Sequence, residues 1–272
     1  SFCPLGIYIM EYQPWEVALI QAWNAAGHGK LIGVASSPIR FWDLRYFSDA
    51  RSITPAGLET KTQIQFRPVP QFLAVNSPIS RELLETAGEL TSRVIDVEAL
   101  MYQYLGVHQT DDLNASSGIL VLGDFFPEMT ERILTMVQSW IELNKGHQDI
   151  FFKPHPANHH PVSNELMSGL IPTALQLSEL FKTCSTVIAP SSSTGSLEAM
   201  CSGKHTISIL DPTLLNFKPL SSMPDDLFVR NSYELQRAMR LATDTNKSVS
   251  QQILHLDPSL PNWKSLLGLE DK

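Results

Sequence analysis

Short apolar runs alternate with amphipathic segments along most of this 272-residue chain, and no other feature constrains its fold as strongly. The apolar run at 5–10 is followed by a segment with helical spacing and then by a second apolar run at 30–36. The helical face is formed by Trp15, Ala18, Leu19, Ala22 and Trp23. A strand, a helix and a strand in succession form a parallel unit, so we predict an α/β fold.

The same succession recurs downstream. Residues 72–75 form a short apolar run, and Ser80 is the predicted N-cap of the helix that follows. Beyond residue 118, predicted strands and helices alternate again in segments at 119–126, 127–144, 149–156, 174–184, 185–190, 196–203, 205–210 and 232–243. Both halves of the chain therefore share one alternating pattern.

A polar segment without periodicity separates the two halves. We place a linker at 111–117, an N-terminal domain at 1–110 and a C-terminal domain at 118–272. Each is predicted to be a Rossmann-like, doubly wound domain, and the two are expected to face a cleft. Because the first predicted strand follows only a few residues, we expect the N-terminal domain to be incomplete.

Composition excludes several classes of protein. A hydrophobic content of 43% and a charged content of 18% exclude a disordered chain. Cys3, Cys184 and Cys201 form no CxxC pair, which argues against a disulfide framework or a zinc cluster and favours a reducing compartment. The net charge of -8 argues against nucleic-acid binding. No apolar run reaches the roughly 18 residues of a membrane span, so we expect a cytoplasmic protein.

The segment 151–156 (FFKPHP) is the first candidate site. An apolar strand ends there in Lys153, and His155 lies between Pro154 and Pro156, which restrict the backbone. A histidine presented beyond the carboxyl end of a strand can bind a phosphate or protonate a leaving oxygen. The alternative is that the prolines merely end a strand. The nearby His159 and His160 have no familiar metal-ligand spacing, and we predict no metal.

A turn rich in hydroxyl groups is the second candidate site. It consists of Ser191, Ser192, Ser193, Thr194, Gly195 and Ser196, and it opens a predicted helix. Hydroxyls, free backbone N–H groups and the helix dipole together bind anions, and simple capping needs only one serine. We therefore favour a phosphate site, with Glu198 facing a ribose hydroxyl or interacting with the helix N-terminus. No GxSxG motif surrounds the serines, which weakens a hydrolase interpretation.

Together the two sites resemble a known family. KPHP followed by SSSTGSLEAMCSGKHTISI resembles the HP and SS motifs of bacterial sialyltransferases and of related Kdo and capsule-polymer transferases. The resemblance covers roughly 118–240 and implies a GT-B type glycosyltransferase that uses a CMP-linked acidic sugar such as Kdo or sialic acid. It implies that Lys153, His155, Pro156 and the serine turn hold the phosphate. The nucleotide sugar is then a co-substrate, and no further cofactor is expected.

The first half resembles the acceptor-side domain of bacterial surface-carbohydrate enzymes. The resemblance rests on EYQPWEVAL, GVASSPIRFWDLRYFSD and VNSPISRELLETAG, but Ser36 and Ser37 stand where that family often has a His-Ser pair. Glu11, after the first strand, is the predicted catalytic base, and Glu16 is expected to be an ordinary helix residue.

Arg40, Asp43 and Arg45 are further candidates in the same half. The two arginines are predicted to clamp a substrate carboxylate, and Asp43 is a further catalytic candidate. The alternative is a structural salt-bridge cluster near Trp42 and Tyr46.

The predicted function is glycosyl transfer from the nucleotide sugar to a bacterial surface glycan or glycolipid, with peripheral membrane association through the acceptor. Because one fold supports several reactions, a nucleotide-sugar epimerase or a polyol-phosphate transferase is the second hypothesis. The third is a non-catalytic nucleotide-binding or scaffolding module.

Overall fold

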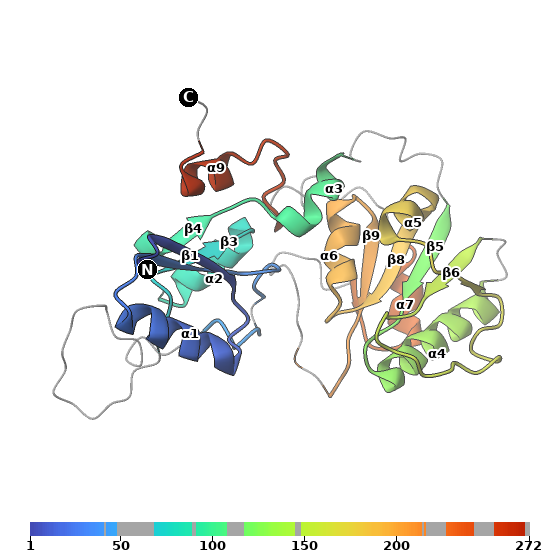
Figure 1. Ribbon diagram of the computed structural model, residues 1–272. Coiled ribbons are helices and arrows are strands. Elements are labelled where there is room, and N and C mark those ends of the chain that lie inside the picture. Colours follow the sequence, from blue (N-terminus) through green and yellow to red (C-terminus); the bar gives the residue numbers. More distant parts are fainter. Residues whose placement is uncertain are drawn as a thin grey trace. The chain divides into compact units, whose positions relative to one another are not determined.

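The computed structural model describes residues 1–40, 42–47, 68–88, 91–107, 117–144, 148–213, 215, 227–241 and 253–269. The chain divides into two compact units (Figure 1). Unit 1 combines Ser1–Gln103 with Gln252–Lys272, and unit 2 is Tyr104–Gln251. The C-terminal residues thus belong to unit 1, which differs from the predicted domain at 118–272. Residues 111–116 of the predicted linker lie outside the described residues.

Unit 1 is built on a parallel sheet of the strands β1 (Leu5–Ile9), β2 (Lys30–Val34), β3 (Phe72–Val75) and β4 (Val94–Asp96), in that order. The helix α1 (Pro14–Ala25) connects β1 to β2, and α2 (Pro78–Thr86) connects β3 to β4. Short 3-10 turns lie at Thr91–Arg93 and Leu100–Tyr102. The alternating pattern therefore correctly predicted a parallel α/β sheet.

The start of α2 corrects one prediction. Its N-cap is Ser77, with Pro78 in the first turn, whereas Ser80 was the predicted cap. Ser80 instead lies buried inside the first turn, and its hydroxyl accepts a hydrogen bond from the backbone N–H of Ile39 at 2.7 Å. Ser80 therefore ties the loop after β2 to α2.

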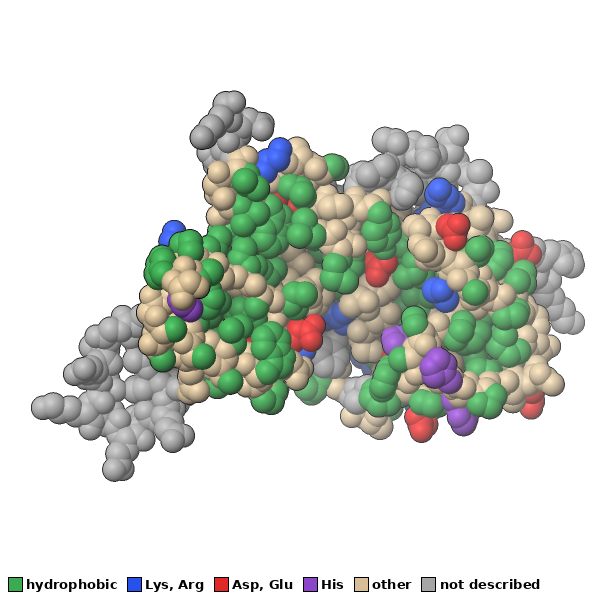
Figure 2. Space-filling model, in the orientation of Figure 1, with side chains coloured by type: hydrophobic (Ala, Val, Ile, Leu, Met, Phe, Trp, Pro, Cys, Tyr) green, Lys and Arg blue, Asp and Glu red, His purple; other side chains and the backbone are tan. Residues whose placement is uncertain are grey.

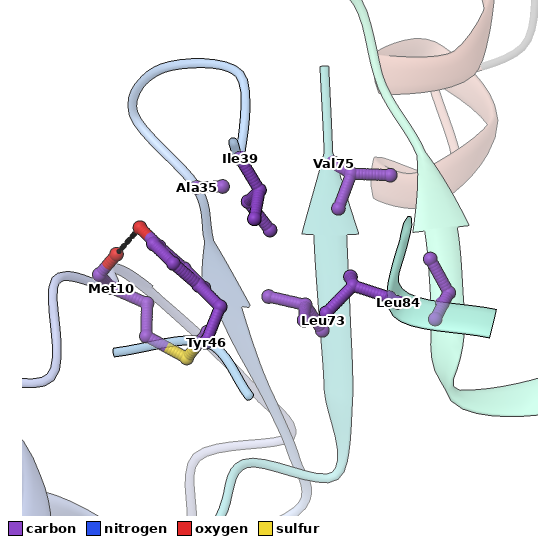
Figure 3. Packing of buried hydrophobic residues seen from close by; sticks show 8 residues of the cluster. Met10, Ala35, Ile39, Tyr46, Leu73, Val75 and Leu84 are labelled. Atoms are coloured by element: carbon purple, nitrogen blue, oxygen red, sulfur yellow. Dashed lines mark hydrogen bonds between the residues drawn. The ribbon is translucent and has the colours of Figure 1, made fainter. Parts of the chain in front are cut away.

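Each face of the unit 1 sheet has its own apolar cluster. Figure 3 shows one cluster, in which Leu84 of α2 packs with Leu73 and Val75 of β3, and the hydroxyl of Tyr46 donates to the carbonyl of Met10 at 2.7 Å. On the other face, Ile32, Ala74 and Val97 pack against Trp263 and Leu266 of α9 (Pro261–Leu267). Figure 1 shows α9 and α1 on opposite sides of this sheet.

A buried carboxylate holds α9 in place. Glu98 is 2% exposed and accepts hydrogen bonds from the backbone N–H groups of Asn262 at 2.9 Å and Trp263 at 3.1 Å. The indole N–H of Trp263 donates to the carbonyl of Glu98 at 2.8 Å. Because a helix N-terminus has unsatisfied N–H groups and a positive dipole end, a carboxylate is a suitable cap. The carboxylate thus holds α9 against the core of unit 1.

Unit 2 contains a six-stranded parallel sheet with the order β10-β9-β8-β5-β6-β7. Its strands are β5 (Gly118–Leu122), β6 (Ile150–Lys153), β7 (Ile171–Pro172), β8 (Cys184–Pro190), β9 (His205–Ile209) and β10 (Phe228–Val229). Its helices are α3 (Gln103–Val107, whose first residue belongs to unit 1), α4 (Pro127–Leu143), α5 (Leu177–Thr183), α6 (Thr194–Cys201) and α7 (Ser232–Ala238). Every residue of the two central strands β5 and β8 is buried except Ser185, which is why both strands are largely apolar.

The strand order of unit 2 reverses between β5 and β8. The chain runs outward from β5 through β6 to β7, returns to β8 beside β5, and then runs outward the other way to β10. This is the doubly wound arrangement that was predicted. Open sheets of this type bind ligands beyond the carboxyl ends of the strands at such a reversal, so the loops after β5 and β8 define the place to look for a site.

Among the described residues, no helix is long and apolar enough to cross a membrane.

Candidate functional site

Asp124 and Ser192 join the two loops at the reversal point. Asp124 follows β5 and is 5% exposed, and its Oδ2 accepts a hydrogen bond from the hydroxyl of Ser192, after β8, at 3.0 Å. Its Oδ1 accepts the backbone N–H of Phe126 at 2.8 Å. The carboxylate therefore fixes the shape of both loops. Asp124 was not among the predicted site residues, because an isolated Asp after a strand is a common turn residue.

Some residues of the serine turn form hydrogen bonds within the fold, and Thr194 is exposed to solvent. Ser193 is the N-cap of α6, and its hydroxyl oxygen accepts the N–H of Gly195 at 3.1 Å. The hydroxyl of buried Ser196 donates to the carbonyl of Ser193 at 2.6 Å. Thr194 is exposed, and the backbone N–H of buried Ser191 donates to Ile209 of β9 at 2.9 Å. Ser193 acts as a cap and still retains its own hydroxyl proton for a ligand.

Gly195 allows the first turn of α6 to lie close to β5. A Cβ at this position would come within 2.7 Å of Leu122 Cδ1. With a larger residue, either the Leu122 side chain or the start of α6 would have to shift. The glycine thus brings the N–H groups of the helix start to the predicted anion site.

Glu198 pairs with Tyr104, which precedes β5 in sequence. The phenolic hydroxyl of Tyr104 donates to Glu198 Oε2. Burial raises the pKa of Glu198, and the hydrogen bond from Tyr104 opposes that rise. Because a carboxylate accepts several hydrogen bonds, Glu198 can accept one from a ribose hydroxyl in addition to the one from Tyr104.

His155 is presented next to the same two loops. Its Nδ1 accepts the backbone N–H of Ala157 at 3.2 Å, which places the proton of the neutral ring on Nε2. A Cβ on Gly123 would lie 3.3 Å from both the His155 nitrogen and the Pro154 Cα, so the glycine lets the end of β5 approach this loop. Nε2–H is therefore the hydrogen-bond donor that His155 offers to a ligand. Pro156 is exposed beside it.

Lys153 and Asn158 anchor the two ends of the His155 loop. Lys153 Nζ donates to the carbonyl of Leu175 at 2.8 Å, and its remaining N–H groups are available to a phosphate. Asn158 Nδ2 donates to the carbonyl of Asp124 at 3.0 Å. The hydroxyl of Thr130 accepts the N–H of Asp124 at 2.9 Å. Through these bonds the loops after β5, β6 and β8 form one connected polar network.

Glu11 in unit 1 forms hydrogen bonds with Ser36 and Glu16. Its Oε1 accepts the hydroxyl of Ser36 at 3.2 Å, so one of the two serines at the doubtful His-Ser position supports the predicted base. Glu16 is buried, and its carboxylate accepts the N–H groups of Glu11, Tyr12 and Gln13 at 2.9, 3.0 and 3.0 Å. Glu16 is thus more than the ordinary helix residue that was expected, because it fixes the backbone that carries Glu11.

The charged loop after β2 contains an ion pair. Arg45 Nε and Nη2 donate to the two carboxylate oxygens of Asp43 at 2.7 and 2.9 Å, and the Arg45 guanidinium lies 5.6 Å from the centroid of the Tyr46 ring. Hydrogen bonding to Asp43 raises the pKa of Arg45. This is the geometry of the structural alternative for Asp43 and Arg45. Arg40 is 8% exposed, and burial lowers its pKa.

Figure 2 shows histidine side chains gathered on one face of unit 2. His155 is half-buried, and His159 and His160 are exposed. In the part of the chain that the structure describes, no three His, Cys, Asp or Glu side chains group as a metal site would require.

Comparison with known proteins identifies the fold. No protein-family model and no curated protein matches the sequence. Among solved structures, the UDP-GlcNAc 2-epimerase of Neisseria meningitidis bound to UDP-GlcNAc is 12% identical, with a TM-score of 0.52 over 98% of this chain and 75% of that one. MnaA of S. aureus with UDP is 11% identical, with a TM-score of 0.52 over 97% and 74% of the two chains.

A plant protein has the same architecture. UGT89C1 of Arabidopsis thaliana is 13% identical, with a TM-score of 0.54 over 92% of this chain and 68% of that one. At these identities the likeness establishes the fold, which is GT-B-like with two Rossmann-like domains.

Proposed function

We propose that this chain is an enzyme that acts on a nucleotide sugar, with the phosphate bound at the start of α6. The observation that carries the proposal is the position of the serine turn. It begins α6 at the strand-order reversal of unit 2, and the Asp124–Ser192 hydrogen bond ties it to the loop after β5. A helix N-terminus with capping hydroxyls at this point of a doubly wound sheet favours a bound phosphate.

Several groups are the proposed hydrogen-bond donors to the phosphate. They are the Ser193 and Thr194 hydroxyls, the N–H groups of the first turn of α6, and Nε2–H of His155. Ser192 is not in this set, because its hydroxyl donates its proton to Asp124. When the bond to the sugar breaks, these donors stabilise the negative charge that develops on the departing phosphate.

Glycosyl transfer to a surface glycan is the reaction that we favour. Glu11, oriented by Ser36, is the proposed base that takes the proton of the acceptor hydroxyl. Arg40 is our proposed candidate for binding a carboxylate on an acidic sugar, because a guanidinium can clamp a carboxylate with two hydrogen bonds. We further propose a CMP-linked donor, on the resemblance of the HP and SS motifs, and a cytoplasmic site of action.

Epimerisation is the second candidate function. Two of the similar structures are, by name or ligand, a UDP-GlcNAc 2-epimerase bound to UDP-GlcNAc and MnaA bound to UDP. A phosphate site at α6 suits both reactions, because the substrate of each is a sugar attached to a nucleotide phosphate. The two functions differ in the product formed from the sugar.

The test combines binding with product analysis. Calorimetric titration with CMP, UMP and UDP should give binding, with CMP the tightest, and NMR should then follow CMP-N-acetylneuraminic acid and UDP-GlcNAc in separate reactions. Release of free CMP supports the transferase, and a C2-epimerised sugar supports the epimerase. Equal binding of the three nucleotides would remove the CMP assignment. A chain that binds none of them would overturn the proposed function.

A further inference from the structure

Two adjacent phenylalanines are exposed beside the candidate site. Phe125 is 55% exposed and Phe126 is 51% exposed, although the strand before them and much of the helix after them are buried. Their rings lie 5.2 Å apart, edge to face, and the Phe125 ring lies 5.7 Å from the His155 ring. Exposed apolar rings at the edge where doubly wound sheets bind ligands indicate that the rings contact a ligand.

The loop that carries the two rings is held in shape. The N–H of Phe126 is fixed by Asp124 Oδ1 at 2.8 Å, and Pro127 begins α4 directly afterwards. Asp124 is itself fixed by Ser192 and Thr130. Because the backbone is already ordered, little conformational entropy of the loop is lost when a flat ligand group packs on the rings.

The order of the strands decides which part of a nucleotide sugar reaches these rings. β5 lies between β8 and β6, so the phenylalanine loop lies between the serine turn on one side and His155 on the other. Glu198, the proposed ribose partner, is on α6 and therefore on the β8 side. With the phosphate at the start of α6 and the ribose toward Glu198, the sugar attached to the far side of the phosphate extends toward β5 and β6.

We propose that Phe125 and Phe126 form a platform for the pyranose ring of the donor sugar. The inference rests on the proposed function. The C–H groups on one face of a pyranose are apolar and weakly positive, and they pack favourably on the negative face of an aromatic ring. The platform holds the sugar beside Nε2–H of His155, which then lies next to the bond between sugar and phosphate.

The test compares two ligands that differ only by the sugar. Calorimetry measures the affinity of Phe125→Ala and Phe126→Ala for UDP and for UDP-GlcNAc, and likewise for CMP and CMP-N-acetylneuraminic acid. Each variant should lose about threefold to tenfold in affinity for the nucleotide sugar that the wild type binds. Affinity for the nucleotide alone should stay within about twofold. Phe125→Tyr, which keeps the ring, should retain the affinity of the wild type.

Leu143→Ala is the matched control. Leu143 is also an exposed apolar residue, at 65%, but it lies at the C-terminal end of the 17-residue helix α4, whereas the two phenylalanines directly precede its N-terminal end. It should change no affinity. Equal losses for nucleotide and nucleotide sugar would assign the platform to the nucleobase and overturn the inference, as would unchanged affinities in both alanine variants. A wild-type chain that binds neither ligand would instead refute the proposed function, and the inference with it.

Discussion

Replacing Ser193 by glycine separates the two roles that its hydroxyl can have. The Ser193 oxygen accepts the N–H of Gly195 at 3.1 Å, so the residue caps α6 whether or not a ligand binds. Glycine is a tolerable N-cap and costs only a few tenths of a kcal/mol relative to serine, whereas alanine costs about 1 kcal/mol. Ser193→Gly therefore removes the hydroxyl while largely preserving the helix start.

The expected sizes of the two effects differ enough to be measured. A hydrogen bond to a charged phosphate contributes about 1.5–3 kcal/mol, so Ser193→Gly should weaken nucleotide binding roughly 10- to 150-fold. Its melting temperature should fall by about 1 °C or less. Ser193→Ala should show a similar loss of affinity and a melting temperature lower by about 2–4 °C, because the cap is lost as well.

Calorimetric titration with the tightest-binding nucleotide and a thermal melt of the same samples provide both quantities. A Ser193→Gly chain that binds the nucleotide as tightly as the wild type would refute a phosphate contact at Ser193. It would leave capping as the only role of this hydroxyl.

Three further outcomes are expected. His155→Ala should lower turnover about a hundredfold or more with little change in the denaturant midpoint, because the ring is half-buried on a loop. Glu98→Gln should lower the free energy of unfolding of unit 1 by about 1–3 kcal/mol, measured by urea titration, because two N–H groups of α9 share its carboxylate. Burial raises the pKa of Glu198 in the folded chain, so its charged form is disfavoured there. Wild-type stability should therefore fall relative to Glu198→Gln as the pH rises above 4.5, and parallel pH profiles in urea titrations would contradict this.

Local pattern predicted much of the fold. The central strands β5 and β8 carry the apolar runs at 119–122 and 187–190, and α1 has apolar side chains at helical spacing, so each was recognisable on its own. The placement of α9 was missed because it depends on Glu98, which is 164 residues from Asn262 in the sequence. No local pattern in a short segment such as Pro261–Leu267 shows which sheet it will cover.

The candidate site was predictable where chemistry is concentrated in a short segment. The serine turn and the loop of His155 stand out by composition, and the structure brings both to the edge of one sheet. Asp124 was missed because its importance comes from a hydrogen bond to Ser192, which lies 68 residues further on. Asp43 and Arg45 were recognised by their charges, and their ion pair has the geometry of the structural salt-bridge alternative.

The return of the chain to unit 1 has a consequence for synthesis on the ribosome. Glu98 is translated 164 and 165 residues before the two N–H groups that it caps. The apolar face formed by Ile32, Ala74 and Val97 is likewise translated well before Trp263, which packs against it. At about 5–20 residues per second, this interval is on the order of ten to thirty seconds. Throughout it, one side of the nascent sheet faces solvent while all of unit 2 is made. A nascent chain stalled before α9 should therefore be a preferred client of chaperones that bind exposed apolar surface.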